Sequence, residues 1–402
     1  MNRRRKLTAL AAALLVTGAL AGLVGVAHAG EAAAARQEPT PTAPHKPSLT
    51  PAALPTPLAL PTFTPRPAAL ATGTTSPTDA ALPLLAPLPA DVNPLTGLAM
   101  ADAARLDRRP LLVKISNYPP EVRPQYGINR ADHVWEHVVE GGGTRFTAVY
   151  LSEDIARIGS VRSARLVDLY LTPMYRGLLA YSGSSIGMLQ RLQMQPWFGD
   201  YTFSLEEGDD CPMFCRYDME GVQFWHTMFV SAPAIRERAA ALRVDERVDL
   251  RGLTFSAEPP AGGTAAINID VRYPGTNGFW FYSAAARKYF RWTEGERHLD
   301  SLGDVQVAYT NVVLIYANHV EDPDVAEDEI GSVNYAMDIQ LLSDGPAVIL
   351  RDGQRFDGRW VRPAPEGMMR LLDVEGRDIP LSPGTVWFHL LPLDHTALTV
   401  SS

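Results

Sequence analysis

Apolar and polar positions alternate with a period of two over several short runs, a pattern typical of β-strands. Between residues 92 and 256 these runs predict strands at Leu111–Ser116, His133–Glu140, Thr144–Leu151 and Gly177–Tyr181. Gly141–Gly143 links the second run to the third, and a short glycine link between two strand-like runs predicts a β-hairpin.

Helical spacing of apolar residues appears at three places in the same region. A helix is predicted shortly after Ser163, whose hydroxyl is suited to capping a helix N-terminus. A second helix is expected around Met188–Gln193, and a third should run from Ser231 to Leu242. Strands and helices therefore mix in this region of the chain.

From Ala265 onward helical spacing is nearly absent and short β runs dominate. They are Ala266–Tyr273, Phe279–Tyr282, Tyr289–Trp292, Val305–Tyr316, Ala347–Arg351, Gly358–Arg362 and Thr385–Leu391. A loop rich in Glu, Pro and Gly at Ala257–Gly263 separates the two patterns. The sequence thus predicts an α+β protein, with an α/β domain at residues 92–256 and a smaller, mostly β domain at residues 264–393.

The N-terminal region has a different composition. Residues 1–29 combine a basic start, an apolar run at residues 7–26 and an Ala27-His28-Ala29 end, which together predict a cleaved signal peptide. Retention of residues 7–26 as a membrane anchor is the alternative, because the run is long enough to span a bilayer. Residues 30–91 hold 14 of the 33 prolines and predict an extended, disordered stalk. We therefore expect an exported protein, secreted or held at the cell envelope.

The charge and the cysteine content of the chain exclude some classes of binding partner and metal site. The chain carries 36 basic and 45 acidic side chains, a formal charge of −9, which argues against a nucleic-acid partner. Two cysteines, Cys211 and Cys215, are too few for a four-cysteine metal site, and no cofactor is expected. In an exported protein their spacing predicts one disulfide that closes a small loop.

Two sets of residues resemble a known family. The first set is Asn117, Arg123-Pro124-Gln125, Gly127, Ala131-Asp132, Glu136, Glu140-Gly141-Gly142, Thr144-Arg145-Phe146 and Val161-Arg162-Ser163-Ala164-Arg165. The second is Asn311-Val312-Val313, Asp352-Gly353, Gly358-Arg359-Trp360, Asp373 and Pro383-Gly384-Thr385-Val386-Trp387. Both resemble the YerB-like family, a bacterial extracytoplasmic group known as domain of unknown function 3048.

The resemblance covers about residues 92–393 and implies two domains, the first with three layers of β-β-α type. This chain differs from the family in two respects. It lacks the lipobox cysteine common among the lipoprotein members, and it inserts Asp209–Arg216, which contains both cysteines.

Acidic and basic side chains recur near the predicted hairpin and are the candidate ligand-binding residues. They are Asp132, Glu136, Glu140, Arg145, Arg162, Arg165 and Ser185. Guanidinium groups bind carboxylates and phosphates through paired hydrogen bonds, so the arginines could form a cleft for an anionic ligand. A network of internal ion pairs that only stabilises the fold is the alternative.

Two motifs point to hydrolytic chemistry. His133-Val134-Trp135-Glu136-His137 matches an inverted zinc-protease pattern, but that chemistry needs a helix and the context here predicts a strand, so no metal is expected. Gly183-Ser184-Ser185-Ile186-Gly187 matches G-x-S-x-G between a predicted strand and helix, which would expose Ser185 as a nucleophile. A Gly/Ser turn at a strand end, which could line the same cleft as the arginines, is the favoured explanation, because the β-rich second half does not supply the alternating strands and helices of an α/β-hydrolase.

The sequence therefore favours a binding or scaffolding module over an enzyme. Its expected partner is a cell-envelope component or an anionic small ligand. A cell-envelope hydrolase that uses Ser185 or the carboxylates is the first alternative, and a purely structural surface protein is the second. The sequence predicts neither the ligand nor the oligomeric state.

Overall fold

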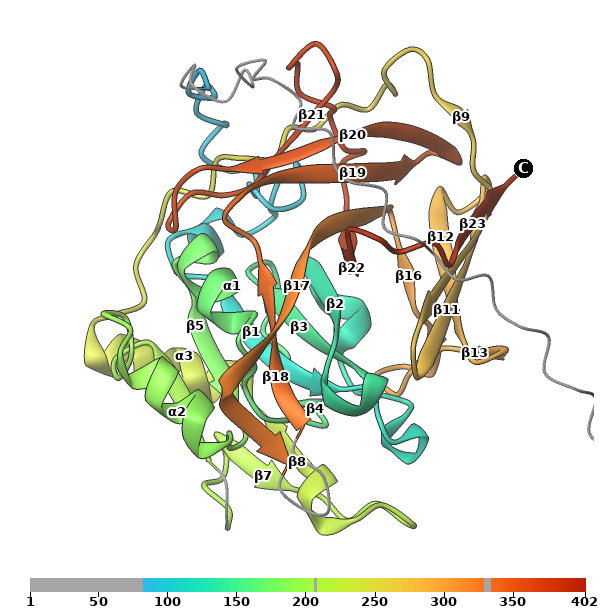
Figure 1. Ribbon diagram of the computed structural model, residues 1–402. Coiled ribbons are helices and arrows are strands. Elements are labelled where there is room, and N and C mark those ends of the chain that lie inside the picture. The colour runs from blue at the N-terminus through green and yellow to red at the C-terminus, as the bar shows by residue number, and fades with distance from the viewer. Residues whose placement is uncertain (1–81, 206–207, 329–333) are drawn as a thin grey trace, which may run out of the picture. The chain divides into compact units, whose positions relative to one another are not determined.

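The computed structural model describes residues 82–205, 208–328 and 334–402, which fall within one compact unit (Figure 1). The predicted signal peptide and nearly all of the predicted stalk lie outside the described residues. Three α-helices occur in the described chain: α1 (Asp168–Tyr175), α2 (Ile186–Gln193) and α3 (Ala232–Leu242). Short 3-10 helices occupy Ala103–Leu106, Pro120–Val122, Ile128–Arg130, Glu140–Gly142 and Phe224–His226.

A large mixed sheet forms the centre of the unit and draws strands from both predicted domains. From the first it takes β1 (Leu111–Ser116), β2 (His133–Val138), β3 (Thr144–Tyr150), β5 (Leu178–Tyr181) and β6 (Thr202–Ser204). From the second it takes β9 (Thr264–Ala265), β17 (Asn311–Asp328), β18 (Asn334–Gln340), β19 (Ser343–Arg351), β20 (Gln354–Arg362), β21 (Arg370–Leu372) and β22 (Val386–Pro392). The order is β21-β20-β19-β17-β22-β2-β3-β1-β5-β6, with β18 paired to β17 and β9 to β20.

The two segments meet where β2 pairs in parallel with β22. His133 lies opposite Val386, and Glu136 opposite His389. A parallel pair requires a long connection, and here it spans the whole chain between residues 138 and 386. The sheet therefore joins elements that are far apart in the sequence.

Three smaller sheets complete the described chain. The second sheet contains β10 (Asn268–Tyr273), β11 (Thr276–Ser283), β12 (Lys288–Thr293), β13 (Glu296–Arg297), β16 (Ala308–Tyr309) and β23 (Leu398–Ser401). The others contain β4 (Ile158–Gly159), β7 (Phe214–Arg216) and β8 (Met228–Val230), and β14 (Leu299–Asp300) with β15 (Val305–Gln306).

Each face of the large sheet packs against a different layer. Side chains of α1 and α2 cover one face, where they share a core with Leu112 and Trp135. Side chains of α3 and of the second sheet cover the other face, where they share a core with Val113 and Val134. This arrangement confirms the predicted α+β class. A β-β-α layering was expected within the first domain alone, but here the second β layer comes from the C-terminal segment.

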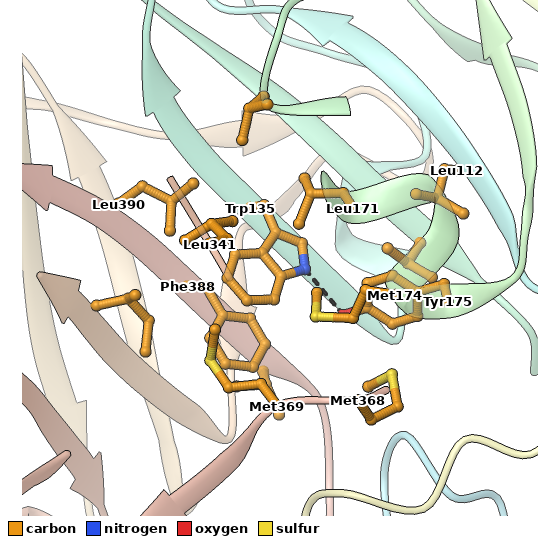
Figure 2. Close-up of a cluster of buried hydrophobic side chains, with 14 of the residues drawn as sticks. Leu112, Trp135, Leu171, Met174, Tyr175, Leu341, Met368, Met369, Phe388 and Leu390 are labelled. Atoms are coloured by element: carbon orange, nitrogen blue, oxygen red, sulfur yellow. Dashed lines mark hydrogen bonds between the residues drawn. The ribbon is translucent and has the colours of Figure 1, made fainter. Parts of the chain in front are cut away.

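The central strands are buried on both faces. All six residues of β1 are buried, and its apolar side chains divide between the two cores, with Leu112 on one face and Leu111, Val113 and Ile115 on the other. Figure 2 shows Trp135 of β2 stacked on Phe388 of β22, with ring centroids 4.0 Å apart. Its indole nitrogen donates a hydrogen bond of 2.8 Å to the hydroxyl of Tyr175 on α1. This cluster fixes the helical layer to the junction of the two segments.

Most predicted elements are confirmed, with three differences. The first helix begins at Asp168 and lacks the predicted Ser163 cap, because the chain from Ser163 to Val167 is not yet helical. Residues 305–316 form three strands rather than one, and β17 continues to Asp328. Ten strands of the described chain were not predicted at all: β4, β6, β7, β8, β9, β13, β14, β18, β21 and β23. Among the described residues, no helix is both long and apolar enough to cross a membrane.

Candidate functional site

Four arginines surround one pocket of about 370 Å³. Arg145 comes from β3, Arg162 and Arg165 from the segment that precedes α1, and Arg216 from β7. The remaining lining residues are Ser163, Ser182, Gly183, Ser184, Ser185, Trp225 and Glu327. We call this site the arginine pocket. Its volume lies within the range of about 300–1,000 Å³ that is usual for small-molecule sites.

Of the four pocket arginines, Arg165 is paired with two carboxylates. Its Nε donates a hydrogen bond of 2.7 Å to Glu140, and its Nη1 lies 3.2 Å from a carboxylate oxygen of Glu327. Its third bond goes to the carbonyl of Ala164 at 2.9 Å. These contacts hold Arg165 in a fixed orientation at the edge of the pocket.

Arg145 and Arg162 have a different environment. Arg145 donates to the carbonyl of Ser163 at 3.2 Å, and Arg162 donates to the carbonyl of Trp225 at 3.0 Å. Among the described residues, neither guanidinium has a carboxylate within 4.0 Å. Two cations are thus held in place by backbone carbonyls, without a countercharge in contact.

The electrostatics of the two side chains follow from this geometry. Burial lowers the pKa of Arg145 well below its usual value, and the charges of Arg165 and Arg162 lower it further. Burial likewise lowers the pKa of Arg162 to about 10, with contributions from Arg165 and Arg216. Both shifts mean that the protonated form is disfavoured by repulsion and desolvation, which an anion in the pocket would offset.

Ser185 lies at the pocket wall and also begins α2. Its Oγ accepts a hydrogen bond from the amide of Met188 at 3.2 Å, so it acts as the N-cap, and it donates to Glu327 at 3.1 Å. Burial raises the pKa of the Glu327 carboxyl, although the adjacent Arg165 opposes the shift. The predicted strand–turn–helix context of G-x-S-x-G is present, but the described lining of the pocket contains no histidine to activate the serine.

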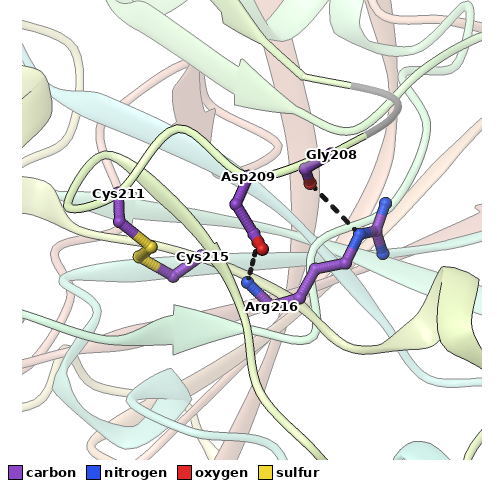
Figure 3. The surroundings of a disulfide bond; sticks show 5 residues. All are labelled: Gly208, Asp209, Cys211, Cys215 and Arg216. Atoms are coloured by element: carbon purple, nitrogen blue, oxygen red, sulfur yellow. Dashed lines mark hydrogen bonds between the residues drawn. A yellow bond between two sulfur atoms is a disulfide. The ribbon is translucent and has the colours of Figure 1, made fainter. Parts of the chain in front are cut away.

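The disulfide between Cys211 and Cys215 is present as predicted, in a small hairpin beside the pocket (Figure 3). The amide of Arg216 donates to Asp209 at 2.7 Å, and its Nε donates to the carbonyl of Gly208 at 3.3 Å. The guanidinium also packs 3.9 Å from the ring centroid of Phe224. The inserted hairpin therefore positions one of the four pocket arginines.

Asp132 lies outside the arginine pocket. It is 2% exposed, and its carboxylate accepts hydrogen bonds from Asn93 at 2.9 Å and from the amides of Leu151 and Ser152 at 2.6 and 3.0 Å. The hydroxyl of Ser152 donates to it as well. These contacts close the loop after β3 onto the start of β2, so Asp132 stabilises the local structure.

Glu136 lies on the opposite side of the large sheet from the α1–α2 layer. Both oxygens of its carboxylate bond to Arg291 of β12, at 3.0 and 2.9 Å, and both side chains are fully buried. Trp387 and Thr144 donate to the same carboxylate. Thus, of the three candidate carboxylates Asp132, Glu136 and Glu140, only Glu140 contacts an arginine of the pocket.

The H-x-x-E-H residues follow the alternation of a strand, as predicted. His133 contacts the hydroxyl of Tyr175 and the carbonyl of Leu95, and His137 Nε2 lies 2.8 Å from Lys114 Nζ, whereas Glu136 faces the other way. The described chain contains no cluster of three metal-binding side chains. This geometry differs from the helical one that the zinc-protease pattern requires.

A buried polar network lies beneath the pocket. Lys114 Nζ is 3.1 Å from Asp168 and 2.7 Å from the hydroxyl of Thr147, and all three side chains are buried. Burial lowers the pKa of Lys114 to about 8, against the opposing influence of Asp168. The Lys114 carbonyl accepts from the amide of Arg162, and Asp168 accepts from the amide of Arg165. The network thereby fixes the backbone that carries two pocket arginines.

Comparison with known proteins gives the family. The model described as "Protein of unknown function (DUF3048) N-terminal domain" matches residues 95–245, and its C-terminal counterpart matches residues 269–388. The chain belongs to the DUF3048 family. All four pocket arginines are therefore in its N-terminal domain, and Arg145, Arg162 and Arg165 lie within the motifs on which the sequence resemblance rests.

DUF3048 relatives extend the match to most of the chain. A protein of Bacillus subtilis (strain 168) named "Putative lipoprotein YerB" is 28% identical over 315 residues, covering 77% of this chain and 88% of the relative. The crystal structure of YerB protein from Bacillus subtilis superimposes with a TM-score of 0.64 at 25% identity, covering 77% of this chain and 99% of that one.

Seven lining residues of the pocket were not among the predicted site residues. Ser163, Ser182, Gly183 and Ser184 lie within three residues of a predicted one, whereas Trp225, Arg216 and Glu327 do not. Arg216 was noted only as the end of the cysteine insert. Glu327 falls in an acidic stretch with a proline, which has low strand propensity, and Trp225 precedes a strand in a segment without periodicity. The sequence signal for the pocket was the recurrence of arginine next to serine, as in Arg162-Ser163. No such pattern occurs at Arg216, Trp225 or Glu327.

Proposed function

We propose that this protein is an extracytoplasmic binding module whose arginine pocket holds an anionic group of its ligand. The observation that carries the proposal is the pair Arg145 and Arg162, which the backbone holds together without a carboxylate in contact among the described residues. Guanidinium groups with free donors bind phosphate and carboxylate oxygens strongly. Serine hydroxyls along the same wall supply further donors.

The extracytoplasmic location rests on the N-terminal sequence and on the lipoprotein name of the relative. The basic start, the apolar run and Ala27-x-Ala29 predict cleavage before Gly30. N-terminal sequencing of protein recovered from the source cells should therefore begin at Gly30 or within about two residues of it. A sequence that retained the apolar run would instead support a membrane anchor.

A hydrolase that uses Ser185 has less support. The hydroxyl already caps α2 and bonds to Glu327, and a Ser–His arrangement requires an imidazole within hydrogen-bond reach. The purely structural alternative predicts no anion binding at all. A measurement of anion binding therefore distinguishes a structural protein from the proposed binding module.

The test is calorimetric titration of the folded protein with inorganic phosphate at low ionic strength. We expect binding that weakens at higher salt, because the attraction between charges is screened. Arg162→Gln should weaken binding at least about tenfold, since it removes a charged hydrogen-bond donor. The matched control Arg272→Gln, which removes an exposed arginine paired with Asp270 on β10, should leave binding unchanged. Absence of phosphate binding by the wild type would refute the proposal.

A further inference from the structure

The arginine pocket is larger than a single anion needs, and its remaining lining is not cationic. A water molecule occupies about 30 Å³ in the liquid, so a cavity of about 370 Å³ holds several times the volume of an inorganic phosphate. Hydroxyls of Ser163, Ser184 and Ser185 and the carboxylate of Glu327 line the rest. These groups suit a ligand that carries hydroxyls beside its anionic group.

An exposed tryptophan completes the lining. All seven tryptophans lie in the described residues. Of these seven, Trp225 alone is exposed, with 55% of its surface accessible. It lies in the 3-10 helix Phe224–His226, and its carbonyl is the acceptor of Arg162. The backbone of Trp225 is therefore held beside a pocket arginine, and its exposed side chain lines the pocket.

We infer that the ligand is an anionic saccharide: a sugar ring that packs its C–H face on Trp225 while its phosphate or carboxylate binds Arg145 and Arg162. An indole offers a large apolar face, and a sugar ring has one face of C–H groups and hydroxyls at its edge. Those hydroxyls can bond to the serines and to Glu327. This inference rests on the proposed function and adds the chemical class of the ligand.

Two other ligand classes share part of this chemistry. A nucleotide also combines a phosphate with a ring that stacks on tryptophan, but it presents few hydroxyls to the serines. An anionic lipid surface could accept exposed Trp225 and Phe224, but residues 30–402 carry 32 basic and 45 acidic side chains, a charge of −13 that such a surface would repel. The saccharide is favoured on both counts.

The experiment compares inorganic phosphate with glucose 1-phosphate, glucose 6-phosphate and glucuronic acid by calorimetry. At least one of the three saccharides should bind tenfold or more tightly than phosphate. Trp225→Ala should remove that difference while changing phosphate affinity less than twofold, and Trp225→Phe should retain most of it. Arg162→Gln should weaken phosphate and saccharide alike. Phe281→Ala, an exposed aromatic change on β11, is the matched control and should alter neither.

The possible failures are distinguishable. If phosphate binds but no saccharide exceeds it tenfold, or if the difference survives Trp225→Ala, the saccharide inference is wrong and the anion pocket stands. If adenosine 5′-monophosphate exceeds every saccharide, or if the protein sediments with phosphatidylglycerol vesicles through Trp225, the ligand belongs to another class. If neither phosphate nor any saccharide binds, the proposed function fails as well.

Discussion

Replacing an arginine of this chain by glutamine should cost much stability at Arg291 and little at Arg162. Arg291 is fully buried, and its guanidinium bonds both oxygens of Glu136 at 3.0 and 2.9 Å. Arg291→Gln would leave the Glu136 carboxylate buried with Trp387 and Thr144 as hydrogen-bond donors and with His389 Nδ1 at 3.4 Å. Removing one partner of a buried ion pair costs about 3–5 kcal/mol of unfolding free energy, and we expect a loss in that range.

Arg162→Gln should have a much smaller effect on stability. The change removes the bond to the Trp225 carbonyl, but it also removes repulsion by Arg165 and Arg216, which lowers the pKa of Arg162. Because the two effects oppose each other, we expect a change of about 1 kcal/mol or less, as for partly exposed ionic groups in general.

Urea unfolding of the two variants and the wild type measures the difference. Coincident transitions by tryptophan fluorescence and far-ultraviolet circular dichroism would establish a two-state process, and equal slopes would make the free energies comparable. The double variant Glu136→Gln/Arg291→Gln is the control, and it should recover part of the loss because no unpaired charge remains buried. A loss above about 3 kcal/mol for Arg162→Gln would show that the pocket arginines are structural and would refute the binding proposal.

Three further outcomes are expected. Burial lowers the pKa of His226 to about 4. The unfolded chain therefore binds its proton first, so His226 should contribute about 1–2 kcal/mol to the fall in unfolding free energy between pH 7.5 and pH 5.5, to which His133, His137, His298 and His389 also contribute, and His226→Gln should reduce the fall by that share. Reduction of the Cys211–Cys215 disulfide should lower the unfolding free energy by about 2 kcal/mol or less. It should also weaken phosphate binding, because the disulfide hairpin positions Arg216. Two free thiols in protein purified without reductant would contradict the disulfide. Ser185→Ala should cost about 1 kcal/mol in thermal unfolding, because α2 loses its N-cap, and no change would mean that the cap is dispensable.

The elements that the sequence predicted well are those whose burial follows a simple period. β1 matches the prediction at both ends, and α3 ends at Leu242 as predicted, with Ser231 as its N-cap. In these segments the alternation or the cap is a local property. The local sequence therefore contains enough information to define both the element and its boundary.

The far end of β17 could not be predicted in this way. Five of its twelve residues beyond Tyr316 are acidic and one is Pro323, and the pairing with β18 shifts register between Asp322 and Ala326. A strand of this composition forms because β18 and α2 pack against it, which is a tertiary effect that overrides local propensity. Since Glu327 lies on this strand, its position at the pocket was hidden as well.

The candidate site was predicted in part for a related reason. Alternation correctly placed Glu136 on the face opposite to His133 and His137, but it cannot tell what covers each face. Glu136 met Arg291 from the second sheet, more than 150 residues away in the sequence. The arginines, in contrast, came together because Arg162 and Arg165 are neighbours and β3 pairs with β1 next to them.

The placement of the pocket explains how a cluster of cations can persist without a ligand. Arg145 belongs to a central strand, and the amides of Arg162 and Arg165 bond to Lys114 and Asp168 in the buried network below. The backbone of the arginines is thus held by the core of the large sheet, and their repulsion cannot be relieved by moving apart. On the proposed function, a bound anion supplies relief beyond that from Glu140 and Glu327, and the rigid backbone then favours binding, as expected for a preorganised site.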